Sequence, residues 1–264
     1  MKKNITMKDI AKQAGVSVAT VSYVINNRTD QRISESTRKK VLQIVNLLDY
    51  MPNSSAQSLA TNKTSLIALY TTPETSLLKR SEQMLVIEIL AQVLKNFGYN
   101  LNFKCSRDIN KLNQVDAILC YDVNLDYFYQ IGDKNLIPLL AIDTLVDIPW
   151  FFQVCSNYDE IKGYADKHFG LNNYSFLALS PNNETLKHYI EDTFTNIIFI
   201  EDFQELASLT GNIVYHQSSL IPYLKEQQHG LYVANNYEKK LEKICSCIEL
   251  AVNRVPDLEH RYYI

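Results

Sequence analysis

The sequence predicts an all-α head of three helices and a hinge helix, followed by an α/β body of two subdomains. Up to about residue 64, apolar side chains recur at helical spacing between capping residues. From Ser65 onward, short apolar runs alternate with helical patterns, which is typical of parallel sheets covered by helices. Charge divides at the same place: residues 1–64 carry net +6 and the remainder −9. A basic segment joined to an acidic body is typical of a nucleic-acid module attached to a second domain.

Composition argues against several other classes of protein. No stretch approaches the length of uninterrupted apolar residues that a membrane span needs, and MKKNITMKDI lacks the apolar core of a signal peptide. The five cysteines are scattered and form no CxxC pair, and no common catalytic or phosphate-binding motif occurs. The five histidines stand apart from one another. We therefore expect a cytoplasmic protein without a metal, a cofactor or an enzymatic activity.

Two capped helices begin the head. Thr6 is placed to cap a helix that starts at Met7, with Asp9 completing a capping box. Gly15 ends that helix because glycine accepts the positive φ of the turn. Ser17 then caps a second helix. Two short helices joined by a glycine turn form a helix-turn-helix, a unit that places its second helix in the major groove of DNA.

Two faces of the second helix differ. Val21, Val24 and Ile25 share the inward face, whereas Ala19, Tyr23 and Asn26 share the opposite one. A third helix, capped by Ser34 and stopped by Pro52, closes a small core with an apolar stripe made of Val41, Ile44, Val45 and Leu48. After Pro52, a fourth short helix is predicted to run from residue 53 to Leu59.

In the body, the apolar pattern of the sequence predicts strands at 65–71, 99–105, 115–122 and 137–143, and a helix over 83–98. Ligands of open α/β sheets bind beyond the carboxyl ends of the strands. This rule, with the ability of aromatic rings to stack on sugars, selects candidate effector-binding residues: Tyr70, Thr72, Tyr121, Asp122, Asp143 and Trp150. Ordinary core or interface packing is the competing interpretation for each aromatic residue.

Three segments, ITMKDIAKQAGVSVATVSYVIN, RISESTRKKV and YMPNSSAQSLATNKTSLIAL, resemble the lactose-repressor/galactose-repressor (LacI/GalR) family of bacterial transcription factors. The resemblance implies that Val18, Ala19 and Tyr23 read base edges in the major groove. It implies phosphate contacts from Thr6, Ser17, Ser22 and Asn26. It also places a minor-groove hinge at Asn53, Ala56, Gln57 and Leu59, where Leu59 is the side chain wedged between base pairs.

The rest of the chain resembles the periplasmic-binding-protein-like effector domain of the same family. The resemblance implies a DNA-binding domain at 1–52, a hinge and linker at 53–63 and a body at 64–264. Within the body it implies an N-subdomain at about 64–153 plus 236–254 and a C-subdomain at about 154–235 plus 255–264. The C-subdomain is shorter than is usual in the family, and the shortage lies between Ser180 and Gly230.

Several positions depart from the family pattern. Tyr23 and Gln57 stand where arginine is common. Ser156 stands where an aspartate is common, and IVYHQSS offers His216 and Gln217 where a strand commonly ends in aspartate. A tyrosine cannot hold guanine with two hydrogen bonds, so we expect a half-site less anchored on guanine.

The resemblance implies a transcriptional regulator, most simply a repressor, that binds a pseudo-palindromic double-stranded operator as a homodimer. A sugar or related small molecule is the candidate effector. The main alternative is a DNA-binding regulator whose degenerate body senses no small molecule and serves dimerisation or a protein partner. A further alternative is a ligand-binding or enzymatic protein whose helix-turn-helix head is incidental.

Overall fold

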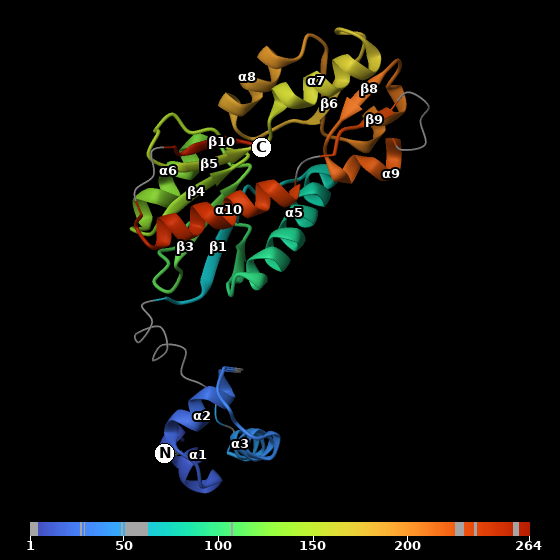
Figure 1. Ribbon diagram of the computed structural model, residues 1–264. Helices are drawn as coiled ribbons and strands as arrows, with labels where there is room; N and C mark the ends of the chain where they lie inside the picture. The colour runs from blue at the N-terminus through green and yellow to red at the C-terminus, as the bar shows by residue number, and fades with distance from the viewer. Residues whose placement is uncertain are drawn as a thin grey trace. The chain divides into compact units, whose positions relative to one another are not determined.

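The computed structural model describes residues 5–264 apart from 27, 29, 49, 51–62, 107, 225–229, 235–236 and 256–258. The chain divides into two compact units, Met1–Lys63 and Thr64–Ile264 (Figure 1). Pro52, the predicted stop of the third helix, and the predicted hinge helix after it lie outside the described residues. Among those described, no helix is long and apolar enough to cross a membrane.

The described part of the head contains three helices: α1 (Met7–Ala14), α2 (Val18–Ile25) and α3 (Glu35–Leu47). Their buried faces meet in one apolar core made of Ile10, Ala11, Ala14, Val21, Val24, Val41 and Ile44. This is the three-helix arrangement that the periodicity predicted, and it leaves the opposite face of α2 in solvent.

Side-chain caps set the ends of the head helices where the sequence predicted them. Thr6 and Asp9 form a capping box, in which the Asp9 amide donates to the Thr6 hydroxyl and the Asp9 carboxylate accepts from the Thr6 amide. Gly15 ends α1 at φ +67°, a left-handed conformation that costs glycine little. The hydroxyls of Ser17 and Ser34 accept from the Thr20 and Thr37 amides at the starts of α2 and α3.

The body contains two parallel sheets. The larger has the strand order β10-β5-β4-β3-β1-β2. Its strands are β1 (Leu66–Thr71), β2 (Asn100–Lys104), β3 (Ala117–Tyr121), β4 (Leu139–Ile142), β5 (Phe152–Cys155) and β10 (Arg261–Tyr263). Helices α5 (Leu77–Asn96) and α10 (Tyr237–Val252) pack on one face, and α6 (Leu125–Lys134) packs on the other (Figure 1).

The smaller sheet has the strand order β7-β6-β8-β9. Its strands are β6 (Ser175–Leu179), β7 (Ile197–Ile200), β8 (Ile213–Tyr215) and β9 (Gly230–Tyr232). Helices α7 (Tyr158–Phe169) and α8 (Glu184–Thr193) cover one face. The other face packs against the short helices η1 (Phe203–Ser208), η2 (Ser218–Leu220) and α9 (Ile221–Leu224). The α/β body with two subdomains is therefore confirmed.

Two expectations about the body need correction. Residues 261–263 do not belong to the C-subdomain: β10 pairs with β5 in the larger sheet, with Arg261 opposite Gln153, and Tyr262 packs in that sheet's core. The helix expected over 83–98 begins earlier, at Leu77, because the Ser76 hydroxyl accepts from the Lys79 amide and caps it there. That earlier turn places Lys79 beside the smaller sheet's subdomain.

Candidate functional site

The outer face of α2 presents the three predicted base-reading residues. Val18 is 41% exposed, although it is apolar, and Ala19 is also exposed. Tyr23 is half-buried, and the guanidinium of Arg28 lies 5.8 Å from its ring centroid. An exposed apolar start to a short capped helix is suited to contact with thymine methyl groups.

The predicted phosphate-binding residues lie at the ends of helices. Thr6 and Ser17 are the N-caps of α1 and α2. The side-chain amide of Asn26 donates to the Ser22 hydroxyl at 3.2 Å, which pairs these two residues near the end of α2. Backbone N–H groups at a helix start favour anions, and hydroxyl and amide groups commonly contact phosphate oxygens. Asn53, Ala56, Gln57 and Leu59 lie outside the described residues.

Arg28 is a feature of this face that the sequence reasoning missed. It sits over the Tyr23 ring within the range of a cation–π contact. Its guanidinium also donates two hydrogen bonds to Asp30, at 2.8 and 2.6 Å. Both groups of this ion pair are about half exposed, so the pair is weak. In the sequence, the only signal for this contact is that Arg28 follows Tyr23 by five residues, just beyond the end of α2.

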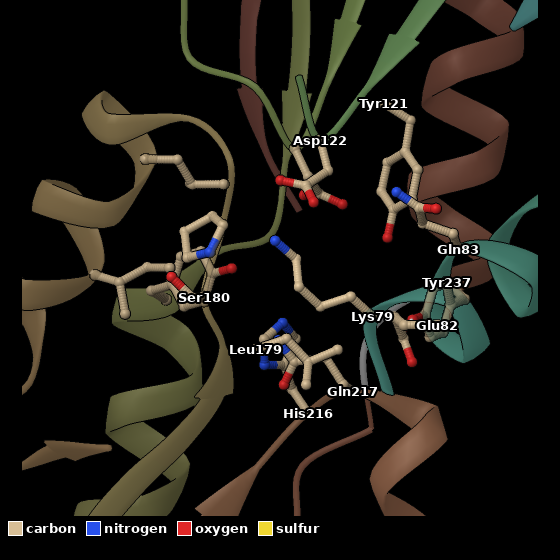
Figure 2. Close-up of a pocket in the computed structure, with 15 residues that line it drawn as sticks. Lys79, Glu82, Gln83, Tyr121, Asp122, Leu179, Ser180, His216, Gln217 and Tyr237 are labelled. Atoms are coloured by element: carbon tan, nitrogen blue, oxygen red, sulfur yellow. The ribbon is translucent and has the colours of Figure 1, made fainter. Parts of the chain in front are cut away.

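A cleft between the two sheets of the body forms the second candidate site (Figure 2). The larger-sheet side contributes Tyr121, Asp122 and Asp143, as the sequence predicted for the carboxyl ends of β3 and β4. Both aspartates have a positive φ, +47° and +44°, directly after their strands. His216 and Gln217 reach the cleft from the end of β8. The remaining cavity is small, about 60 Å³.

Three predicted effector residues do not line this cavity. Tyr70 is 1% exposed and packs in the core beneath α6, because side chains of a strand alternate between its faces. Thr72 lies at the edge of the cleft and donates its hydroxyl hydrogen to the Asp122 carbonyl. Trp150 is 81% exposed in the loop before β5.

Two ion pairs occupy the cleft. The Lys240 ammonium donates to both carboxylate oxygens of Asp143, at 2.6 and 2.7 Å, and to the Ser156 hydroxyl at 3.1 Å. The Lys79 ammonium lies 3.3 Å from the Glu74 carboxylate. The side chains of both lysines are at least nine-tenths buried, so each charge depends on its partner.

Burial shifts the pKa values of several cleft residues. It raises the pKa of Asp122 to about 6, against the opposing effect of Lys79. It lowers the pKa of His216 to about 4, so the imidazole is neutral at pH 7. Within the described residues, His216 Nδ1 and Gln217 Oε1 are buried without a hydrogen-bond partner. Such atoms call for water or a small polar group in the cavity.

Comparison with known proteins identifies the head. The family model "Bacterial regulatory proteins, lacI family" matches residues 6–53, the segment that contains α1, α2 and α3. The HTH-type transcriptional regulator GalS of Salmonella typhimurium is 52% identical over 65 residues, covering 25% of this chain and 18% of that protein. The head of the chain belongs to the LacI family.

The body is similar to LacI-family proteins as well. The probable HTH-type transcriptional repressor ExuR of Bacillus subtilis is 31% identical over 242 residues, covering 89% of this chain and 66% of ExuR. The chain thus spans slightly under two thirds of this LacI-family relative. The Lac repressor bound to ONPG has a similar fold, with a TM-score of 0.62 at 13% identity, covering 99% of this chain and 97% of that chain. That likeness confirms the architecture of head and two-subdomain body.

Proposed function

We propose that this chain, with its LacI-family head, is a transcriptional repressor that binds a pseudo-palindromic DNA operator as a homodimer in the cytoplasm, without enzymatic activity. The observation that carries the proposal is the exposed face of α2, held out by a three-helix core and two side-chain caps. Similar proteins described as transcriptional repressors, such as ExuR, support it. The net charge of +6 on residues 1–64 suits a polyanionic partner.

Base reading would come from Val18, Ala19 and Tyr23. The first two offer only apolar contact, which suits thymine methyl groups. Tyr23 adds one hydroxyl, and Arg28 on its ring supplies a guanidinium next to the groove. The proposed half-site is therefore rich in A·T pairs, with its cationic contact at one end of α2.

Orientation on the duplex would come from the phosphate contacts. Thr6, Ser17, Ser22 and Asn26 are the residues proposed for these contacts. The hinge residues Asn53, Ala56, Gln57 and Leu59 would enter the minor groove at the operator centre, where a Leu59 wedge unstacks one base step. Two hinges, one from each protomer, would share that cost.

Dimerisation is proposed to use the body. One face of α5 carries three exposed apolar residues at helical spacing: Leu77 at 64%, Met84 at 48% and Leu85 at 36% exposure. Residues seven and eight apart on a helix share a face, so these side chains form one stripe. Exposed apolar stripes of this kind mark protein–protein contacts.

The test is selection of binding sites by the full chain from random-sequence duplexes. The proposal expects a two-fold symmetric motif whose affinity falls steeply with salt. Ala19→Asp, which adds a carboxylate to the exposed face of α2, should abolish enrichment. Ala207→Asp adds the same charge at an exposed position of the body and should not. The proposal is contradicted if the wild-type chain enriches no motif. It is equally contradicted if the Ala19→Asp variant still enriches the motif.

A further inference from the structure

The cleft of the body is occupied by side chains of the chain itself. Lys79 extends from the first turn of α5 into the space between the two subdomains (Figure 2). Its ammonium group donates to the Asn182 side-chain oxygen at 3.1 Å and pairs with Glu74 at 3.3 Å. Asn182 follows β6 of the smaller sheet, so this lysine joins the two subdomains.

Asn182 makes the densest set of contacts across the cleft. Its backbone amide donates to Asp122 Oδ1 at 2.8 Å, and its side-chain amide lies 2.9 Å from Asp122 Oδ2. The same amide lies 3.1 Å from the Asp122 carbonyl and 2.5 Å from Glu74 Oε1. Both oxygens of the Asp122 carboxylate are thereby engaged by one residue of the opposite subdomain.

A second group of contacts lies beside the first. Glu82 of α5 accepts from the Ser219 amide at 2.9 Å and from the Tyr237 hydroxyl at 2.9 Å. The Asn183 side chain exchanges two hydrogen bonds with the backbone of Leu145, at 3.1 Å each. Leu78 of α5 is fully buried in the apolar core of the smaller subdomain. The two subdomains are thus joined by paired charges, amides and apolar packing.

We propose that Glu74, Lys79, Asp122 and Asn182 form a latch that closes the cleft without any bound small molecule. The latch uses the groups that could otherwise bind a polar effector. The remaining volume of about 60 Å³ holds a few water molecules, which can satisfy His216 and Gln217. A sugar ring could enter only by displacing Lys79 and Asn182, which would leave buried charges without partners.

The latch has a consequence for regulation that rests on the proposed repressor function. The charged and amide groups of the latch satisfy one another, so the contacts that hold the two subdomains together need no effector. Ligands shift a conformational equilibrium only through different affinities for its two states. A repressor with this latch is therefore controlled by its abundance or by a partner protein, and sugars do not release it.

Hydrogen–deuterium exchange of the full chain, without DNA or added ligand, tests the latch directly. The amides of Asn182 and Ser219 each donate to a carboxylate of the other subdomain. We expect both to be protected in the wild type, and Asn182→Ala to speed exchange of both by at least tenfold. The matched control is Asn196→Ala. The side-chain amide of Asn196 donates to the Asn172 and Tyr174 carbonyls, which belong to the smaller subdomain. The control variant should leave the Ser219 amide unchanged.

Three results would overturn the latch: rapid exchange of both amides in the wild type, protection that appears only with monosaccharides or sugar phosphates, or unchanged exchange in Asn182→Ala. The wild-type measurement decides the matter even where the variant does not fold. Operator selection is measured separately on the same protein. Loss of DNA binding with protected amides refutes the repressor function and leaves the closed cleft standing.

Discussion

His216 should make the body lose stability as the pH falls, and His216→Asn should remove that loss. The imidazole is 4% exposed, stacks on Phe176 with ring centroids 5.6 Å apart, and meets the edge of Tyr158. Burial lowers its pKa from 6.5 to about 4; the nearby Asp143 carboxylate opposes this shift and Lys240 adds to it. Protonation therefore favours the unfolded chain, where the imidazole is in water.

The magnitude follows from the two pKa values. Because the folded pKa is the lower one, the neutral histidine gives its full stability above pH 6.5 and loses it as the pH falls toward 4. Between pH 7.5 and pH 5.0 the loss amounts to about 2 kcal/mol. Asparagine also fills the site but does not titrate. Any packing cost of His216→Asn is constant with pH, so the pH-dependent difference isolates the proton.

Urea unfolding of the full chain, followed by circular dichroism at pH 7.5 and 5.0, measures this difference for the body. We expect the stability advantage of the wild type over His216→Asn to shrink by about 2 kcal/mol at the lower pH. His168→Asn is the control, because the His168 side chain is exposed on the surface of the body. An advantage that stays constant between the two pH values refutes a neutral, buried His216.

Two further predictions concern the recognition face and the second ion pair. Tyr23→Arg should strengthen guanine at one position of each half-site by about 1–3 kcal/mol in site selection, and an unchanged preference would contradict base reading at this position. Lys240→Met leaves the Asp143 carboxylate without its cation and should cost about 3–5 kcal/mol of unfolding free energy, measured by urea unfolding. Lys239→Met, at an exposed position of the same helix, is the control, and an equal loss in both variants would rule out a role for the buried pair.

The head could be predicted almost residue by residue because its signals are local. Each cap lies three residues or fewer from the amide that it accepts from, as Thr6, Ser17 and Ser34 illustrate. The inward stripe of α2 follows from the helical period alone. The side of a sheet that a strand residue faces is also periodic, yet the prediction that Tyr70 lines the effector site is wrong. Counting back from the strand end would have placed it in the core beneath α6.

The cleft could be predicted only on one side. Asp122 and Asp143 end apolar runs, and the rule that ligands bind at the carboxyl ends of parallel strands places them at the edge. Lys79, Glu82 and Asn182 gave no such signal, because their partners lie up to 155 positions away in the chain. A lysine on a helix is usually solvated, and only the tertiary structure shows that Lys79 is buried.

Ser156 and His216 stand where aspartate is common in the family, and the cleft gives both departures a common explanation. Each of the four carboxylates described there is engaged within the chain: Asp122 by Asn182, Glu74 by Lys79 and Asn182, Asp143 by Lys240, and Glu82 by Ser219 and Tyr237. An aspartate at position 156 would place another carboxylate where Ser156 now accepts from Lys240, and two acids would share one cation. The neutral His216 likewise adds no charge beside this pair. A cleft whose charges are already balanced by its own residues has little to offer the hydroxyl groups of a sugar, so serine and histidine here are consistent with self-closure.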